Sequence, residues 1–147
     1  MVITTRARYA TRALMEIALL NGTRPVGIRS ISESQEIPPK YLESLFRQLK
    51  AAGIVRSVRG AGGGYILSRD ASRITVWDVV AAVESNLAIV ECGSDPGACA
   101  RSTNCVTREL WLEVDQRVGQ LLESVSVADL AERHQRRCQN QALNFTI

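Results

Sequence analysis

The stretch "PPKYLESLFRQLKAAGIVRSVRGAGGGYILS", residues 38–68, constrains the fold more than any other part of the chain. Its first half has apolar residues at the i, i+3, i+4 and i+7 positions of an amphipathic helix: Leu42, Leu45, Phe46 and Leu49. Pro39 suits the first turn of this helix, and Gly53 marks its end. The second half alternates apolar and polar residues on both sides of a glycine cluster. The stretch therefore predicts a helix that is followed at once by a β-hairpin.

Two more helices are predicted before this stretch. Residues 5–21 show the same helical period, with Asn21-Gly22 as the stop: Ala10, Ala13, Leu14 and Ile17. Residues 28–37 suit a helix of two to three turns, with Ser30 and Glu33 as a possible capping box. Three helices and then a hairpin is the order of a winged helix-turn-helix domain, whose third helix enters the major groove of DNA.

The polar face of the third predicted helix is suited to nucleic acid. Lys40, Ser44 and Arg47 lie opposite the apolar stripe, and Glu43 and Lys50 lie on its flank. Their cationic and hydrogen-bonding groups are anchored by the apolar side of the same helix. This face is therefore the predicted DNA-reading surface.

The tip of the predicted hairpin also suits DNA. Arg59 can neutralise a phosphate or enter a minor groove. The glycines that follow allow close backbone approach: Gly60, Gly62, Gly63 and Gly64. A nucleotide-binding loop is excluded, because no Lys-Ser or Lys-Thr pair follows and no helix begins there. A plain tight hairpin is the alternative.

Charge is unevenly distributed along the chain. The net charge is +3, yet residues 1–80 carry twelve Lys and Arg against six Asp and Glu, and the remainder is acidic. A basic first half is typical of a surface that binds a polyanion, although a solvated surface is the other explanation.

A long amphipathic helix is predicted over residues 105–125, the longest in the chain. One face is apolar and is widened by Trp111 and Leu122: Val106, Leu110, Val114, Val118, Leu121 and Val125. One neighbouring helix would not cover this face, so we expect a homodimer; packing on the chain's own domain is the alternative. A two-fold dimer places two recognition helices about 34 Å apart, one turn of DNA.

Capping boxes are predicted on both sides of that helix. Thr75 and Asp78 open a short helix that ends near Glu84, and Ser126 and Asp129 open a last helix. Periodicity is then lost, so a frayed tail is expected at the C-terminus.

Length and composition indicate one ordinary domain with an appended arm. The chain has 147 residues, 46% of them hydrophobic, and its longest apolar runs are far too short for a membrane span. The first apolar stretch is broken by Glu16 and lacks a cleavage site. We therefore expect a cytoplasmic protein, in which clustered thiols indicate a metal or a redox centre before they indicate disulfides.

Three of the four cysteines lie in "ECGSDPGACARSTNC", residues 91–105. Their long, unpaired spacing disfavours a zinc knuckle, whereas iron-sulfur clusters are held mainly by cysteine thiolates and tolerate another ligand. A zinc clip and a metal-free thiol switch remain alternatives. An enzyme is disfavoured, because the only histidine, His134, stands far from these cysteines in the polar C-terminal part.

The chain resembles the bacterial winged-helix regulators of the IscR/NsrR type, which carry iron-sulfur clusters. The resemblance covers nearly the whole chain and is strongest in "YLESLFRQLKAAGIV" and in the Cys-x6-Cys-x5-Cys loop ahead of a long helix. It implies a homodimeric transcription factor whose promoter binding depends on the cluster and senses iron, redox state or nitric oxide. The implied DNA-contacting positions are Lys40, Tyr41, Glu43, Ser44, Arg47, Arg59 and Gly60. The implied cluster ligands are Cys92, Cys99 and Cys105.

The resemblance fails at the fourth ligand. The position of a ligand histidine is Arg108, and the position of an acidic ligand borrowed from the partner subunit is Arg8, just before Tyr9. Arginine stays protonated and has no lone pair to give. The candidates that remain are Glu109, His134 and Cys138, then Glu84, Glu91, solvent or a small thiol. The closest resemblance favours a 2Fe-2S cluster slightly, and a 4Fe-4S cluster suits three cysteines with one exchangeable corner.

The predicted fold is therefore mainly α with a small β-hairpin wing. We expect a winged helix-turn-helix domain over 1–84, a cluster-binding loop over 85–105, a dimerisation helix and a C-terminal helix over 106–135, and a flexible tail over 136–147. The expected partners are double-stranded promoter DNA and a second copy of the chain, with no membrane and no small-molecule substrate.

Overall fold

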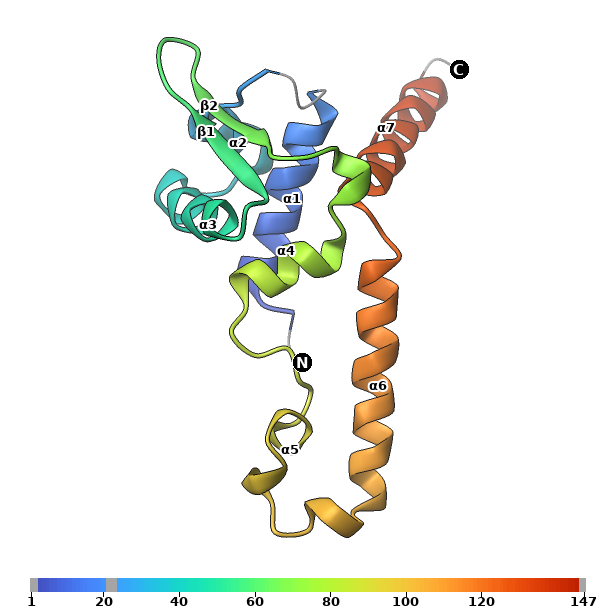
Figure 1. The fold of residues 1–147 in the computed structure, drawn as a ribbon. Helices are drawn as coiled ribbons and strands as arrows, with labels where there is room; N and C mark the ends of the chain where they lie inside the picture. The colour runs from blue at the N-terminus through green and yellow to red at the C-terminus, as the bar shows by residue number, and fades with distance from the viewer. Residues whose placement is uncertain (1–2, 21–23, 146–147) are drawn as a thin grey trace.

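A computed structural model describes residues 3–20 and 24–145 (Figure 1). The helices are α1 (Thr5–Leu19), α2 (Ile28–Gln35), α3 (Pro39–Ala51), α4 (Val76–Val83), α5 (Glu91–Ser94), α6 (Val106–Glu123) and α7 (Val127–Asn144). Strands β1 (Val55–Val58) and β2 (Gly64–Leu67) form an antiparallel hairpin, and 3-10 turns cover Ala71–Arg73, Pro96–Ala98 and Ser102–Asn104. The predicted winged fold, mainly α with one hairpin, is confirmed. No helix in these described ranges is long and apolar enough to cross a lipid bilayer.

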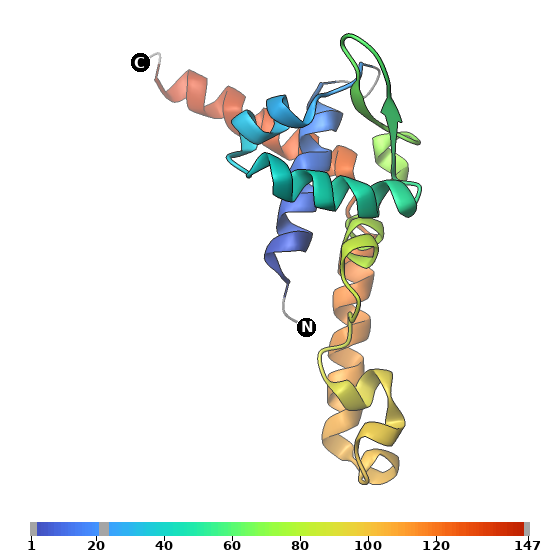
Figure 2. The same ribbon diagram turned by 90° about the vertical axis from the view of Figure 1, so that its left-hand side faces the viewer.

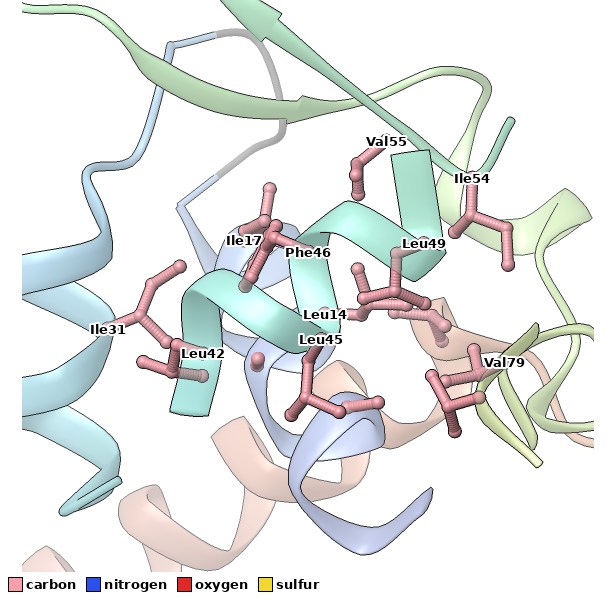
Figure 3. Close-up of a cluster of buried hydrophobic side chains, with 14 of the residues drawn as sticks. Leu14, Ile17, Ile31, Leu42, Leu45, Phe46, Leu49, Ile54, Val55 and Val79 are labelled. Atoms are coloured by element: carbon pink, nitrogen blue, oxygen red, sulfur yellow. The ribbon is translucent and has the colours of Figure 1, made fainter. Parts of the chain in front are cut away.

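The core lies between α1, α2 and α3, with α4 closing one side (Figure 3). The apolar residues predicted to face inward on α1 and α3 are all buried: Ala10, Ala13, Leu14, Ile17, Leu42, Leu45, Phe46 and Leu49. Burying each of the large ones stabilises the fold by about 1.5–3 kcal/mol relative to exposure. The helical period of the sequence therefore fixes which side of α3 faces outward.

The C-terminus of α3 is set by Gly53, as predicted. Gly53 has a φ of 71°, a left-handed conformation that glycine adopts without strain. Its N–H donates to the carbonyl of Lys50 at 3.0 Å, and the N–H of Ile54 donates to Leu49 at 2.9 Å. This pair of bonds is a Schellman motif, which ends the helix and turns the chain directly into β1.

The N-terminus of α2 differs from the prediction. The helix begins at Ile28 with Gly27 as its N-cap and no side-chain capping bond, so the predicted Ser30–Glu33 capping box is wrong. Val26 forms a backbone bridge with Tyr65 of the hairpin, with both N–H···O distances at 2.9 Å. This bridge fixes the chain just before Gly27, so the helix starts early and Ser30 lies inside it. Asn21-Gly22, the predicted stop of α1, lies outside the described residues.

The predicted capping boxes at Thr75 and Ser126 are both confirmed. They stand side by side, because residues 74–76 and 125–127 form an antiparallel bridge. In this bridge the N–H of Val76 donates to Val125 at 2.8 Å, and the N–H of Val127 donates to Ile74 at 2.8 Å. The junction of α6 and α7 is therefore bonded to the segment that leaves the wing.

From that junction the two long helices diverge (Figures 1 and 2). Helix α6 extends away from the winged domain as an arm, and α7 returns to pack on α1. The expected tail from residue 136 is instead helical as far as Asn144, and α7 has 18 residues, as many as α6. The cap at Ser126, the ion pair between Glu132 and Arg136 and the helix-favouring Glu, Arg, Gln and Ala side chains support this helix without an apolar stripe.

Candidate functional site

The outward face of α3 presents the predicted DNA-reading side chains together. Four of the predicted residues are exposed on it: Lys40, Glu43, Ser44 and Arg47. Tyr41 is half-buried, and its ring meets that of Tyr9 edge-on, with 5.7 Å between centroids. Figure 2 shows α3 crossing the front of the domain, with the hairpin rising from its C-terminal end. Tyr41 therefore also serves to hold α3 on α1.

The hairpin tip presents Arg59 and Gly60 to solvent. Gly60 has a φ of 106°, and its carbonyl accepts from the N–H of Gly63 at 3.0 Å, which closes the turn. Lys50 donates to the hydroxyl of Ser57 on β1 at 3.0 Å. This bond joins α3 to the wing and was not predicted. The sequence hinted at this hydrogen bond only by placing Lys50 on the flank of the helix and Ser57 at an outward position of the strand.

The cysteine loop lies beside the far end of α6 from the winged domain (Figure 1). Cys92 is in α5, Cys99 follows a 3-10 turn and Cys105 is the N-cap residue of α6. Cys92 and Cys105 are half-buried and Cys99 is exposed, all as free thiols. In the part of the chain that the structure describes, no three His, Cys, Asp or Glu side chains converge as a metal-binding group.

Side chains of α6 hold the N-terminal side of this loop. Arg108 donates from Nε to the carbonyl of Cys92 at 2.8 Å, and Asp115 accepts the N–H of Ile89 at 2.9 Å. Within the loop, the hydroxyl of Ser102 donates to the carbonyl of Pro96 at 2.6 Å. Arg108, at a position where the resemblance has a ligand, thus has a structural role that the sequence did not reveal.

Neighbouring groups shift the pKa of the Cys105 thiol. Its Sγ lies 3.1 Å from Oγ1 of Thr107. That hydrogen bond, followed by one from the backbone N–H of Arg108, lowers the pKa of Cys105, and the charge of Arg101 acts in the same direction. Because the thiolate is the form that binds metals and attacks electrophiles, Cys105 is prepared for either chemistry.

The fourth-ligand candidates lie in three parts of the chain. Glu91 opens α5 next to Cys92, and Glu109 is exposed in the first turn of α6, so both lie close to the loop along the chain. His134 and Cys138 contact each other on α7, with 3.6 Å between Nε2 and Sγ, at the opposite end of the molecule (Figure 1). Glu84 accepts from the hydroxyl of Thr4 and pairs with Arg6 at 3.6 Å. The single chain therefore leaves Glu91 and Glu109 nearest to the three cysteines.

The chain matches known proteins over most of its length. The model of the Rrf2 family, described as "Iron-dependent Transcriptional regulator", matches residues 3–133. The chain is 41% identical to "Protein rrf2" of Nitratidesulfovibrio vulgaris over 146 residues, covering 99% of this chain and 97% of that protein. It is 39% identical to the HTH-type transcriptional regulator IscR of Xenorhabdus nematophila over 135 residues, covering 92% and 82%.

Solved structures agree with these relatives. The structure of CymR, the global cysteine regulator of B. subtilis, matches with a TM-score of 0.76 and 32% identity, covering 90% of this chain and 98% of that one. The structure of T. potens IscR matches with a TM-score of 0.75 and 32% identity, covering 91% and 88%. These matches confirm the prediction of a regulator and not an enzyme. The chain belongs to the Rrf2 family of DNA-binding transcriptional regulators.

Proposed function

We propose that this Rrf2-family protein is a homodimer whose binding to promoter DNA is controlled by an iron-sulfur cluster held by Cys92, Cys99 and Cys105. The observation that carries the proposal is the position of the three thiols. They share one short loop, which is bonded to α6, and the C-terminal end of α6 leads to the bridge between Ser126 and Thr75, the N-cap of α4 in the winged domain. A change in the loop therefore has a continuous path of bonded elements to the DNA-binding domain.

The DNA-reading part of the proposal rests on the exposed face of α3. Lys40, Ser44 and Arg47 are exposed there, and the residues behind them are buried in the core. This helix enters the major groove in winged helix-turn-helix proteins, where such side chains can hydrogen-bond to base edges. Arg59 at the wing tip binds phosphate or the minor groove. Affinity for DNA then falls steeply with salt concentration, because each phosphate contact releases counterions.

The donor set fits an iron-sulfur cluster in its chemistry. It offers three thiols in a solvent-accessible loop, one of them with a lowered pKa, and no Cys-x2-4-Cys pair of the kind that zinc sites use. Three ligands come from Cys92, Cys99 and Cys105, and Glu109 or Glu91 is the nearest source of a fourth. When bound, such a cluster supplies a centre whose charge and ligation change with redox state. A 2Fe-2S cluster is slightly favoured over a 4Fe-4S cluster.

The chain's own residues transmit the state of the loop. Arg108 fixes the carbonyl of Cys92 to α6, and Asp115 fixes the start of the loop two turns further along the helix. Ordering residues 92–105 thus sets the position of the N-terminus of α6, and the bridge between residues 74–76 and 125–127 connects the other end of α6 to the start of α4 in the winged domain. The expected result is a shift between dimer conformers with different spacing of the two α3 helices.

The homodimer is supported by the exposed apolar stripe of α6. Val106, Leu110 and Leu121 remain 77%, 52% and 62% exposed in the single chain. An apolar row of this length on a helix is normally covered, and a second copy offers the same row in return. Val114, Val118 and Val125 of the same face are half-buried in the single chain, so packing on the chain's own domain covers only part of this face.

The test is anaerobic purification followed by a visible absorption spectrum and iron and sulfide counts per chain. We expect a coloured protein with about two or about four irons per chain, and loss of iron and colour in Cys92→Ala. Cys138→Ala is the matched control, because it removes a thiol at the other end of the molecule and should keep the cluster. Glu109→Ala and Glu91→Ala then test the fourth ligand.

Other results would replace the cluster with one of its alternatives. A colourless protein that contains zinc lost in Cys92→Ala would make the loop a zinc clip. A colourless, metal-free protein whose DNA binding changes on oxidation of these thiols would make it a thiol switch. Either result overturns the cluster while leaving the α3 surface as the DNA-binding face.

A further inference from the structure

An apolar groove of about 560 Å³ lies between α1, α4 and the junction of α6 and α7. Its apolar lining comes mainly from Ala7, Val76, Val80, Leu122, Val125 and Leu130. Leu121, which belongs to the exposed stripe of α6, also lines it. The groove is therefore continuous with the domain end of that stripe.

The part of the α6 stripe nearest the cysteine loop is apolar and exposed, so it could fill an apolar groove. Val106 and Leu110 project from the first two turns of α6 and are more than half exposed. Helix α6 is about 27 Å long, from its 18 residues at about 1.5 Å each. In an antiparallel two-fold pairing of two such stripes, the loop end of one α6 meets the domain end of the other. This arrangement covers both the stripe and the groove of each copy.

Three arginines also line the groove: Arg8, Arg12 and Arg133. Arg12 already donates to the side chain and backbone of Gln35, and the charge of Arg133 acts on Asp129. Arg8 donates only to the hydroxyl of Thr5, at 3.1 Å, and has no ion pair among the described residues. None of the three has an ion pair among the described residues, and Arg8 is the one that neither another helix nor a carboxylate engages.

Near the cysteine loop, α6 also carries one carboxylate that has no ion pair among the described residues. Glu113 pairs with Arg117 at 2.6 Å, and Asp115 accepts the N–H of Ile89. Glu109 is exposed, lies at the edge of the stripe beside Val106, and has no ion pair within the part of the chain that is described. If Val106 and Leu110 occupied the groove of a second copy, Glu109 would lie at the rim of that groove.

We propose that Arg8 of one copy pairs with Glu109 of a second copy, in a dimer where the loop end of each α6 occupies the partner's groove. The inference rests on the proposed homodimer and adds its docking site and its charge contact. Glu109 is then engaged by Arg8 and is removed from the fourth-ligand candidates.

The experiment exchanges the two charges. Arg8→Glu alone places two carboxylates at each contact, and Glu109→Arg alone places two guanidinium groups there. Because a two-fold dimer contains the contact twice, each single variant should raise the dimer dissociation constant about tenfold or more in sedimentation equilibrium at low salt. In an equimolar mixture both contacts of the heterodimer become attractive. We therefore expect the mixture to recover a dissociation constant within about threefold of wild type.

Controls separate this pair from the dimer as a whole. Arg137→Glu makes the same charge change on exposed α7 and should leave the dissociation constant unchanged. Leu110→Asp buries a charge in the stripe and should give monomers.

If Leu110→Asp is monomeric while neither charge variant changes the dissociation constant, or if mixing the two variants restores nothing, the Arg8–Glu109 pairing is wrong and the homodimer stands. If Leu110→Asp dimerises like wild type, the homodimer through α6 is itself wrong. Should a reversal impair folding by circular dichroism, Arg8→Gln and Glu109→Gln replace it, with a smaller increase of about threefold expected.

Discussion

At the scale of single residues, α3 separates the requirements of folding from those of DNA recognition. Leu42, Leu45 and Leu49 are almost fully buried, so truncating any of them costs about 2–5 kcal/mol of stability. Ser44 and Arg47 are exposed on the opposite face and contribute little to the core. Substitutions on the outer face therefore report on DNA binding without a change in folding.

Arg47→Ala should weaken binding to a promoter duplex by about 1–3 kcal/mol if Arg47 reads a base. Fluorescence anisotropy with the promoter and with an unrelated duplex of equal length measures the effect, and the melting temperature should not change. Arg136→Ala is the matched control, because it removes an exposed arginine on α7, across α1 from α3 (Figure 1). Equal losses on both duplexes would mark a phosphate contact instead. No loss at all would remove Arg47 from the interface.

Asp129 predicts a pH dependence of stability. Hydrogen bonds from the backbone N–H and then the side chain of Ser126 lower the pKa of Asp129 below its usual value. The unfolded chain therefore binds this proton more readily than the folded one, so stability rises with pH in this range. The contribution is complete above the unfolded pKa, about pH 4, and is lost as the pH falls through the lower folded value. The difference in melting temperature between wild type and Asp129→Asn should accordingly shrink on acidification. A difference that stays constant down to pH 2 would contradict this role of the capping box.

At the scale of elements, local patterns predicted most of the helices and the hairpin, whereas contacts between distant segments were not predictable. The stripe from Leu42 to Leu49 and the cap at Ser126 depend on residues a few positions apart, so the sequence displays them directly. The early start of α2 depends on a bridge from Val26 to Tyr65. The attachment of the arm likewise depends on the bridge between Thr75 and Ser126. No periodicity or spacing in the sequence records either pairing.

The bridge at Val26 makes Gly64 a position of the wing where a side chain cannot be added without moving backbone. A Cβ on Gly64 would lie 2.4 Å from the carbonyl oxygen of Val26, and its φ is 156°. Gly64→Ala must therefore displace backbone, and we expect it to cost roughly 2 kcal/mol or more in chemical denaturation and to weaken DNA binding through the displaced wing. Gly27→Ala is the control, because a Cβ there meets no atom within 4 Å and φ is −73°. Equal stability of the two variants would show that the bridge does not constrain the wing.

At the scale of the whole molecule, the cysteine loop and the DNA-binding domain are joined through α6 and the bridge between Thr75 and Ser126. The sequence predicted the three thiols and the long helix, because their spacing is visible in a single stretch. It did not predict that Arg108 ties the loop to α6, since an arginine carries no signal of which carbonyl it meets. It also left the fourth ligand open. In a single chain, His134 and Cys138 lie on α7, away from the loop, which leaves Glu91, a residue of a second copy, solvent or a small thiol as the source of that ligand.

The measurement that tests control by the cluster most directly is DNA affinity of the same preparation with and without the cluster. Duplexes selected from random sequence, once by the holo protein and once by anaerobically chelated apo protein, would be titrated with both forms over a range of salt concentrations. We predict that the dissociation constants of the two forms differ by about 5- to 150-fold on at least one selected duplex, and that Cys92→Ala behaves like the apo form. Both forms selecting the same duplexes and binding them with equal affinity at every salt concentration would contradict control of DNA binding by the cluster.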